Sequence, residues 1–569
     1  MVPTNQYHIP EMKPKADRSK RSWKLIWIIP LAGLTLAASP LRENYFELSK
    51  QLEIMTALFR ELNIYYVDEL QPGELMETGI NAMVSSLDPY TIYYPESRVE
   101  DLRFMSTGEY GGIGASIQTL NNRHLIVDVL PEFPAAKAGL QIGDELLEVD
   151  GQLLSEINEE LIPEMLQGAS GTEVTIRILG NGATAPTTLT LTRENIKLPA
   201  VPYSEVIGDS TGYVILSAFT RGSSFELRQA IRHLQDSAGI NQLIIDLRGN
   251  GGGLLQESIA IVNLFVPKGE EVVSTKGKNE EWMKSYTTRA DPLVPDLPLA
   301  ILIDGQSASA SEIVAGTLQD LDRAIIVGED SFGKGLVQQS KPLAYGTKLK
   351  VTVAKYYTAS GRCIQRLDYG GERSEDGAAQ ARADSLIQIF HTRNGRPVVD
   401  GKGIQPDIYA SLPSMSYVLE GLYMNGVIFE FANAWCSQRD SIAEPLEFSL
   451  TEEDWEEFIE FAENQPETEY QSRTLALWNE LEKAAEEEQY LLNNQTAYQE
   501  LQALISPNIR RDLNRFKPEI VEALEEEVIM RYHMQPGVIE WSIPKDSVLH
   551  TAITWLSNGE SAKLLSGTE

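Results

Sequence analysis

Cysteine is scarce in this sequence, with only Cys363 and Cys436 among 569 residues. Two cysteines exclude a disulfide-rich framework and lack metal-ligand spacing, although one bridge between them stays open. Basic residues are also in deficit, with 48 lysines and arginines against 82 aspartates and glutamates. A net charge of −34 argues against binding to a phosphate backbone. We therefore expect no nucleic-acid partner.

Histidine is rare too, and no two histidines stand at helix-face spacing with a glutamate, so we expect no metal site. The glycine turn at 247–253 follows a predicted strand, yet it has neither Walker nor Rossmann spacing. We expect that the protein needs no cofactor. The six histidines are at positions 8, 124, 233, 391, 533 and 550.

An apolar run near the N-terminus, Leu25 to Ala38, follows a basic tail at residues 1–24. A basic segment, an apolar segment of this length and small residues after it are typical of an export signal, so residues 25–39 are expected to be a signal peptide or an uncleaved membrane anchor. The remainder would be exported, which predicts a periplasmic protein that is soluble or anchored to the inner membrane.

The candidate chemistry begins with Leu299–Ile303, an apolar run bounded by Asp304-Gly305 that predicts a buried strand. Serines 307, 309 and 311 follow, and apolar residues then return at helical spacing. The strand would deliver hydroxyl groups to a helix N-terminus, where free N–H groups stabilise developing negative charge. The alternative is a capping box between Ser309 and Glu312.

A second predicted strand, Ala324 to Val327, leads to Lys334 between two glycines. A serine hydroxyl needs an adjacent base, and nothing marks a histidine for that role here. A lysine can serve if burial lowers its pKa from about 10.4 to about 7. Phe332, Leu336 and Val337 provide an apolar flank. An ordinary exposed loop is the alternative.

This combination resembles the C-terminal processing peptidases, also called tail-specific proteases. The motifs are S-A-S-A-S-E at 307–312, Q-D at 319–320 and F-G-K-G-x-V-Q at 332–338. The resemblance implies that Ser309 is the nucleophile, Lys334 the general base and Gln338 the residue that orients the lysine. It also implies an oxyanion hole formed by the N–H groups of Gly252 and Ala310. The family usually has DLR-x-N-P-G-G; Gly251 stands at the proline here, so the choice among the three glycines stays open.

Residues 105–197 look like a PDZ domain rather than a generic small β domain. Gly111-Gly-Ile-Gly114 precedes a predicted strand, and AAKAGLQIGDELLEVDG at 135–151 supplies a helix, a turn and a strand in PDZ order. PDZ domains bind a peptide C-terminus as an added strand and hold its carboxylate on loop N–H groups, here those of Gly111, Gly112, Ile113 and Gly114. Arg177 matches a PDZ arginine that contacts the catalytic domain in some members; a plain surface arginine is the alternative.

The resemblance covers about residues 41–410. It implies an α/β, crotonase-like catalytic domain at 198–410, carrying the PDZ domain as an insertion. A helical segment at 41–104 precedes it, and an acidic, mainly helical domain at 411–569 follows. That last domain could serve homo-oligomerisation, adaptor binding or shielding of the site.

We therefore expect an exported serine endopeptidase that recognises the C-terminal tails of proteins through its PDZ domain and cleaves them with a Ser-Lys dyad. Two alternatives come from other classes. One is a non-catalytic PDZ scaffold that binds protein C-termini, and the other is an acyl-CoA enzyme on the same superfold.

Overall fold

The computed structural model describes residues 39–374, 377–465, 472–490, 495–506 and 508–567. The chain divides into two compact units, Met1–Ser86 and Leu87–Glu569. The proposed basic tail and nearly all of the signal or anchor segment lie outside the described residues. Within the described ranges, no helix has both the length and the apolar character needed to cross a membrane.

Over residues 39–86, the described part of the first unit forms helices α2 (Ser39–Tyr65) and α3 (Pro72–Ser85). They agree with the helical segment expected at residues 41–104. The helical prediction is wrong at residues 92–94, which form strand β1 (Ile92–Tyr94) of the second unit. Tertiary pairing makes these residues a strand, because β1 pairs antiparallel with the first residues of a long strand, β18 (Lys348–Thr358).

A six-stranded sheet forms the centre of the catalytic region, in the order β10-β11-β12-β15-β16-β23. The strands β11, β12, β15, β16 and β23 are parallel, and β10 is antiparallel to β11. All five residues of β15 are buried, as expected for a parallel strand covered on both faces. The strands are β10 (Tyr203–Ile207), β11 (Thr211–Ile215), β12 (Gln242–Asp246), β15 (Leu299–Ile303), β16 (Ile325–Gly328) and β23 (Ile408–Tyr409).

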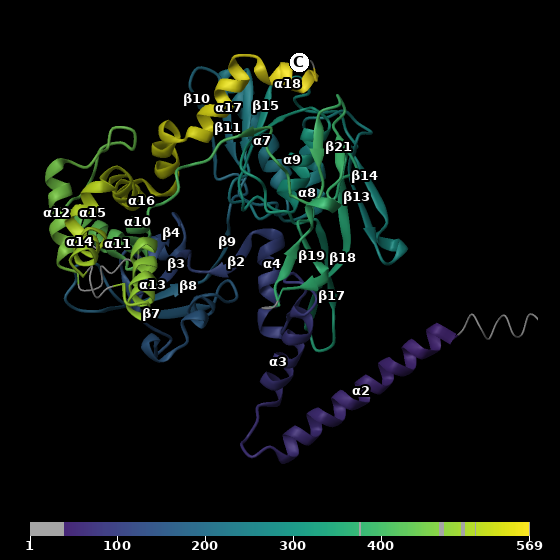
Figure 1. The fold of residues 1–569 in the computed structure, drawn as a ribbon, viewed down its shortest axis with the longest axis horizontal. Coiled ribbons are helices and arrows are strands. Elements are labelled where there is room, and N and C mark those ends of the chain that lie inside the picture. Colours follow the sequence, from purple (N-terminus) through teal and green to yellow (C-terminus); the bar gives the residue numbers. More distant parts are fainter. Residues whose placement is uncertain (1–38, 375–376, 466–471, 491–494, 507, 568–569) are drawn as a thin grey trace, which may run out of the picture. The chain divides into compact units, whose positions relative to one another are not determined.

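Helices cover both faces of this sheet (Figure 1). On one face, Ile245 and Ile301 pack in a core with helices α7 (Ser223–Ala238), α8 (Leu255–Val262) and α9 (Ala310–Asp320). The opposite face, which includes Ile244 and Leu302, is covered by helices from the far end of the chain. These are α17 (Ser547–Ser557) and α18 (Glu560–Ser566).

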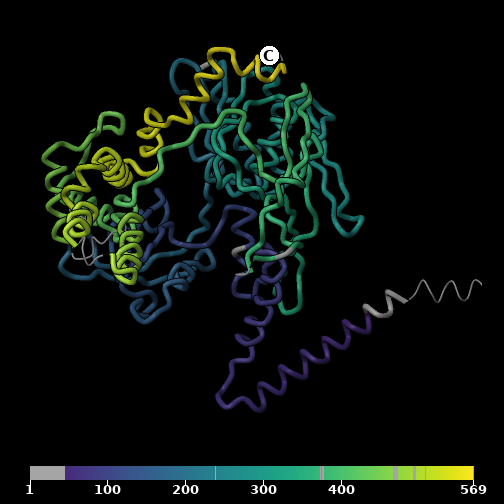
Figure 2. The backbone as a smooth tube through the Cα atoms, in the orientation of Figure 1, coloured from purple at the N-terminus to yellow at the C-terminus, as the bar shows by residue number. Residues whose placement is uncertain are grey.

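The segment 411–569 therefore divides between two hydrophobic cores. The tube in Figure 2 shows the chain leaving the sheet, forming the helical domain and returning as its yellow C-terminal end. An ion pair holds this returning C-terminal segment next to the glycine turn. Arg248 of the turn contacts Asp546, the N-cap of α17, at 2.6 Å.

A second sheet combines β1 and β18 with β13 (Glu271–Gly277), β14 (Lys284–Thr287) and β17 (Leu336–Pro342). All of its pairings are antiparallel. The loop that carries Lys334 enters β17, so this sheet positions the candidate base. Short strands border it: β19 (Leu367–Arg373), β20 (Ala379–Ala381), β21 (Ile389–His391) and β22 (Pro397–Val399).

The PDZ region contains a sheet in the order β3-β4-β5-β7-β8, with β6 paired to β5, and a separate pair β2-β9. Strand β3 stands at one edge, which leaves one side of it without a partner strand. The strands are β2 (Glu109–Gly112), β3 (Ala115–Leu120), β4 (Arg123–Val129), β5 (Glu145–Val149), β6 (Gln152–Leu153), β7 (Glu173–Leu179), β8 (Thr187–Thr192) and β9 (Glu194–Lys197); the helices of the region are α4 (Val99–Thr107), α5 (Pro134–Lys137) and α6 (Ile162–Leu166).

The helical domain has its own aromatic core, in which the Phe431 and Phe458 rings meet edge to face at 5.1 Å. It contacts the PDZ region through an ion pair between Arg123 and Glu430 at 2.6 Å. Its helices are α10 (Tyr417–Met424), α11 (Val427–Cys436), α12 (Glu452–Glu463), α13 (Arg473–Glu487), α14 (Gln495–Ile505), α15 (Ile509–Arg515) and α16 (Lys517–Ser542).

Candidate functional site

Ser309 lies at the sharp turn between β15 and α9, as the sequence predicts. Its φ of 56° and ψ of −109° are strained for a residue with a side chain. Nucleophilic serines on strand-turn-helix elbows have such strain, because it lifts the hydroxyl away from the backbone. Ser309 is partly exposed, so a substrate can reach it.

The two neighbouring serines have a different role. Ser307 and Ser311 are fully buried. The Ser307 hydroxyl donates to the Leu247 carbonyl at 2.8 Å, and the Ser311 hydroxyl donates to the Asn250 carbonyl at 2.8 Å. These bonds attach the serine turn to the glycine turn, so the structure leaves Ser309 as the one accessible hydroxyl of the three.

Gly252 packs directly against the serine turn. A Cβ at this position would lie 2.6 Å from the Ala308 carbonyl oxygen and 2.9 Å from the Ala310 nitrogen, and its φ is +98°. Only glycine fits this close approach. Ala310 begins α9, so its N–H has no acceptor within the helix. The Gly252 N–H, in contrast, donates to the Asn250 side-chain oxygen at 2.8 Å.

The Lys334 side chain is half-buried. Burial and the nearby positive charge of Lys350 together lower its pKa to about 8, whereas the charges of Glu312 and Asp88 oppose this change. The Lys334 Nζ lies 4.1 Å from the centroid of the Tyr90 ring. Within the described ranges, Lys334 Nζ makes no hydrogen bond to Ser309.

Glu312 joins the serine turn and the lysine loop. Its carboxylate is fully buried and accepts the Ser309 N–H at 2.8 Å and the Lys334 N–H at 2.9 Å. It also accepts the Ser331 hydroxyl at 2.5 Å and the Gly333 N–H at 2.8 Å. Burial raises the pKa of this carboxyl, and the four donated hydrogen bonds oppose the rise. One side chain therefore fixes the backbone of both turns.

Gln338 is close to Lys334 in sequence but contacts a different partner. Its Nε2 donates to Thr352 Oγ1 at 3.4 Å across the β17–β18 pairing, beside a register shift between Val337 and Gln338. Its expected role in orienting the lysine stays a prediction.

Sequence reasoning missed three contributors to this site. Glu312 appears in the sequence as half of a capping box, and only the fold shows that it also binds the lysine loop. Tyr90 lies in the segment expected only to be helical, and Lys350 is one lysine among many. The apolar flank is less enclosing than expected, because the Phe332 side chain is 43% exposed.

A groove of about 1010 Å³ lies beside the free edge of β3. Gly111, Gly112 and Ile113 of the expected carboxylate loop line it, together with Ile117 of β3 and Leu166 of α6. Gly114 is not among its lining residues. Its φ is +79°, and a Cβ there would lie 2.6 Å from Phe133 Cβ. An edge strand beside an apolar groove is the arrangement that accepts an added peptide strand.

The remaining candidates are placed as follows. Arg177 on β7 forms a cross-strand ion pair with Glu148 at 3.6 Å, so a contact with the catalytic domain stays a prediction. Cys363 and Cys436 are both free thiols. Over the described ranges, no group of three or more histidine, cysteine, aspartate or glutamate side chains could hold a metal ion.

Comparison with known proteins follows the same division of the chain. Family models match as "Peptidase family S41" over residues 210–370, "PDZ domain" over 102–179 and "Probable PDZ-protease, C-terminal helical domain" over 418–556.

Two curated relatives extend the match, and one solved structure is similar over part of the chain. The carboxy-terminal-processing protease of Bartonella bacilliformis is 37% identical over 337 residues, which are 58% of this chain and 76% of the relative. The carboxyl-terminal-processing protease of Synechocystis is 32% identical over 375 residues, which are 62% of this chain and 86% of the relative. The solved photosystem II D1 C-terminal processing protease aligns with 62% of this chain and 85% of its own, at 25% identity and a TM-score of 0.35. This chain therefore belongs to the PDZ-containing C-terminal processing peptidases.

Proposed function

We propose that Ser309 and Lys334 form the catalytic dyad of a serine endopeptidase. The observation that carries the proposal is the buried Glu312 carboxylate, which accepts an N–H from both residues. A shared anchor holds the two turns in one register, as a nucleophile and its base require. The lowered pKa of Lys334 adds the second requirement, a partly neutral amine.

In the proposed reaction, the neutral Lys334 amine moves from the Tyr90 ring to the Ser309 hydroxyl and takes its proton as Oγ attacks the peptide carbonyl. Gln338 guides this movement. Its Nε2 donates to Thr352, so its Oε1 is the atom that accepts from the amine. Lys334 then protonates the leaving amine, and water hydrolyses the acyl-enzyme with the same base.

The developing oxyanion would be bound by the Ala310 N–H and by an N–H of the glycine turn. Gly252 lies closest to Ala310, and its N–H must exchange its bond with the Asn250 side chain for one with the oxyanion. Asn250 thereby holds this donor in place until substrate arrives.

We further propose that the substrates are exported proteins whose C-terminal tails bind beside β3. The groove lining includes neither Ser309 nor Lys334, so tail binding and cleavage occur at separate places. A tethered tail raises the local concentration of the scissile bond, which favours substrates with an unstructured C-terminal segment.

The test replaces each member of the dyad. Ser309→Ala and Lys334→Ala should each lower kcat/KM on an unstructured, tailed protein by about 10⁴-fold or more, and the double variant should be no worse than either. Lys341→Ala, an exposed lysine on β17, is the control. Thermal unfolding of every variant verifies that the fold is intact.

Retained cleavage in Lys334→Ala would refute the lysine as base. A wild-type protein that binds tailed substrates through the groove yet leaves them uncut would favour the non-catalytic scaffold instead. Mass spectrometry of the substrate distinguishes these outcomes.

A further inference from the structure

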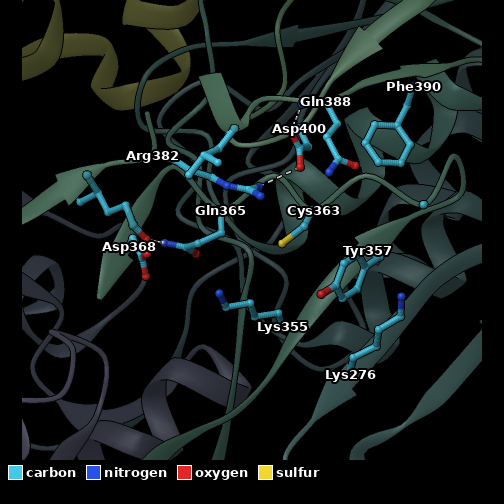
Figure 3. A pocket seen from close by; sticks show the side chains of 13 residues that line it. Lys276, Lys355, Tyr357, Cys363, Gln365, Asp368, Arg382, Gln388, Phe390 and Asp400 are labelled. Carbon is cyan, nitrogen blue, oxygen red and sulfur yellow. Dashed lines mark hydrogen bonds and ion pairs between the residues drawn. The ribbon is translucent and has the colours of Figure 1, made fainter. Parts of the chain in front are cut away.

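A second cavity, of about 540 Å³, opens over the second sheet and is lined by neither Ser309 nor Lys334. Figure 3 shows Lys355, Tyr357, Cys363 and Arg382 around its space. The cavity is adjacent to the base loop through Gln365, whose side-chain oxygen accepts the Gly335 N–H at 2.8 Å.

Two exposed lysines of the cavity lining are cross-strand neighbours. Lys276 on β13 stands directly opposite Lys355 on β18 in the antiparallel register, so both side chains lie on one face of the sheet. Like charges in this arrangement destabilise a sheet. In the described part of the chain, no carboxylate lies within ion-pair distance of either amine. The Lys276 Nζ instead lies 4.2 Å from the centroid of the Tyr357 ring.

A third cation is held in a fixed position beside them. Arg382 forms an ion pair at 2.8 Å with Asp400, a buried carboxylate that also accepts the Gln388 N–H at 2.7 Å. The guanidinium of Arg382 has five N–H donors, and this ion pair uses one of them. The other lining carboxylate, Asp368, is exposed and accepts the Gly370 N–H at 3.1 Å. Cations therefore exceed carboxylates in this cavity, although the whole chain has a net charge of −34.

The size and remaining lining of the cavity indicate an organic anion. A water molecule occupies about 30 Å³ of liquid, so a small inorganic anion would fill a minor part of 540 Å³. Leu367, Leu386 and Phe390 supply apolar surface beside the cations. Ligand pockets of this size combine such surface with a few charged groups that fix orientation.

We propose that this cavity binds the free carboxylate of a C-terminal amino acid or very short peptide. Lys276, Lys355 and Arg382 would contact the carboxylate, and Tyr357 and Phe390 would contact the apolar side chain. The site is separate from the PDZ groove and does not depend on the identity of the catalytic dyad.

Cys363 provides a local reporter, because its thiol lines the cavity. The measurement is the rate of alkylation by iodoacetamide at fixed pH, read by mass spectrometry on the full-length protein. Cys436 in the helical domain is the internal reference thiol. The probe is N-acetyl-phenylalanine, and its carboxamide is the uncharged control.

At a probe concentration about ten times its Kd, alkylation of Cys363 should slow about tenfold relative to Cys436, because only the free cavity reacts. The carboxamide should leave both rates unchanged. Lys276→Gln/Lys355→Gln should abolish the protection. The matched control, Lys284→Gln/Lys341→Gln, removes the same charge from the same sheet outside the cavity and should retain it.

Equal protection by the carboxamide would show an apolar pocket and overturn the proposal. Protection that survives in the Lys276→Gln/Lys355→Gln variant would also overturn it. If inorganic phosphate protects Cys363 as strongly as the probe at equal concentration, the site is an inorganic-anion site, and the amino-acid assignment is wrong.

Discussion

The proposed role of Lys334 as a base requires that its amine be neutral at the working pH. Burial, with help from Lys350, lowers the pKa of Lys334 to about 8. At pH 7 roughly one molecule in ten then has a neutral amine, against fewer than one in a thousand for a free lysine. The remaining charged population lies over the Tyr90 ring, which stabilises a cation.

The pH dependence of cleavage follows from this pKa. We expect kcat/KM to rise about tenfold per unit below pH 8 and to level off above it, because the neutral amine is the active form. Initial rates on an unstructured substrate between pH 6 and 10 measure the midpoint. A profile that continues to climb to pH 10 would contradict the assignment.

Lys350→Gln should move this midpoint to higher pH. The positive charge of Lys350 disfavours the charged form of Lys334, so its removal raises the pKa of Lys334 and lowers activity at pH 7. Lys341→Gln, exposed on the neighbouring strand, is the control and should leave the midpoint unchanged. An unchanged midpoint in Lys350→Gln would exclude the charge coupling.

At the scale of elements, Glu312 decides whether the serine turn and the lysine loop stay in register. Its two carboxylate oxygens each accept two hydrogen bonds from these segments. A carboxamide offers one acceptor oxygen and turns an NH2 group toward two donors, so it cannot replace the carboxylate.

Glu312→Gln should therefore lower the free energy of unfolding by about 2 to 5 kcal/mol, because two buried donors lose their acceptor. It should also move the midpoint of the pH profile to lower pH, since Glu312 raises the pKa of Lys334. The control is Glu525→Gln, a buried glutamate of the helical domain, which should lose stability without moving the midpoint. An unmoved midpoint in Glu312→Gln would reduce Glu312 to a purely structural role.

The edge strand β3 supports a prediction on tail binding. Ile117→Asp puts a charge into the apolar groove and should raise KM for a substrate with an apolar C-terminal tail by about tenfold, with kcat little changed. Gln118→Asp, one residue along the strand and outside the groove lining, is the control. Equal KM values in the two variants would place tail binding elsewhere.

At the scale of the molecule, the C-terminal helices are part of the catalytic fold. Leu549 of α17 is fully buried against the central sheet. Leu549→Ala should cost about 2 to 5 kcal/mol of stability, because it leaves a cavity beneath the strands. Leu481→Ala on α13, at a position 51% exposed, should change stability by less than about 0.5 kcal/mol. Chemical denaturation, monitored by intrinsic fluorescence, compares the two variants.

The sequence predicted the central strands well, because a strand that is buried on both faces appears in the sequence as a short continuous apolar run. Leu299–Ile303 has the bounds expected of it, and β12 (Gln242–Asp246) is the strand expected before the glycine turn. The helix after Ser309 also agrees with expectation. The strand at Ile92–Tyr94 could not be predicted from the sequence. Three residues are too few to show the alternation of a strand, and their partner strand, β18, lies more than 250 residues away.

What the sequence determined by itself was local: the strand that leads to Ser309, the glycines beside Lys334 and the family to which these motifs belong. Adjacent residues create such features, so they can be read in order along the chain. Tertiary structure alone decided that Glu312 fixes both turns, that Lys334 lies over Tyr90, and that Lys276 and Lys355 are neighbours beside one cavity. Electrostatic environment depends on distance in space, and folding brings these charges together from segments that the sequence keeps far apart.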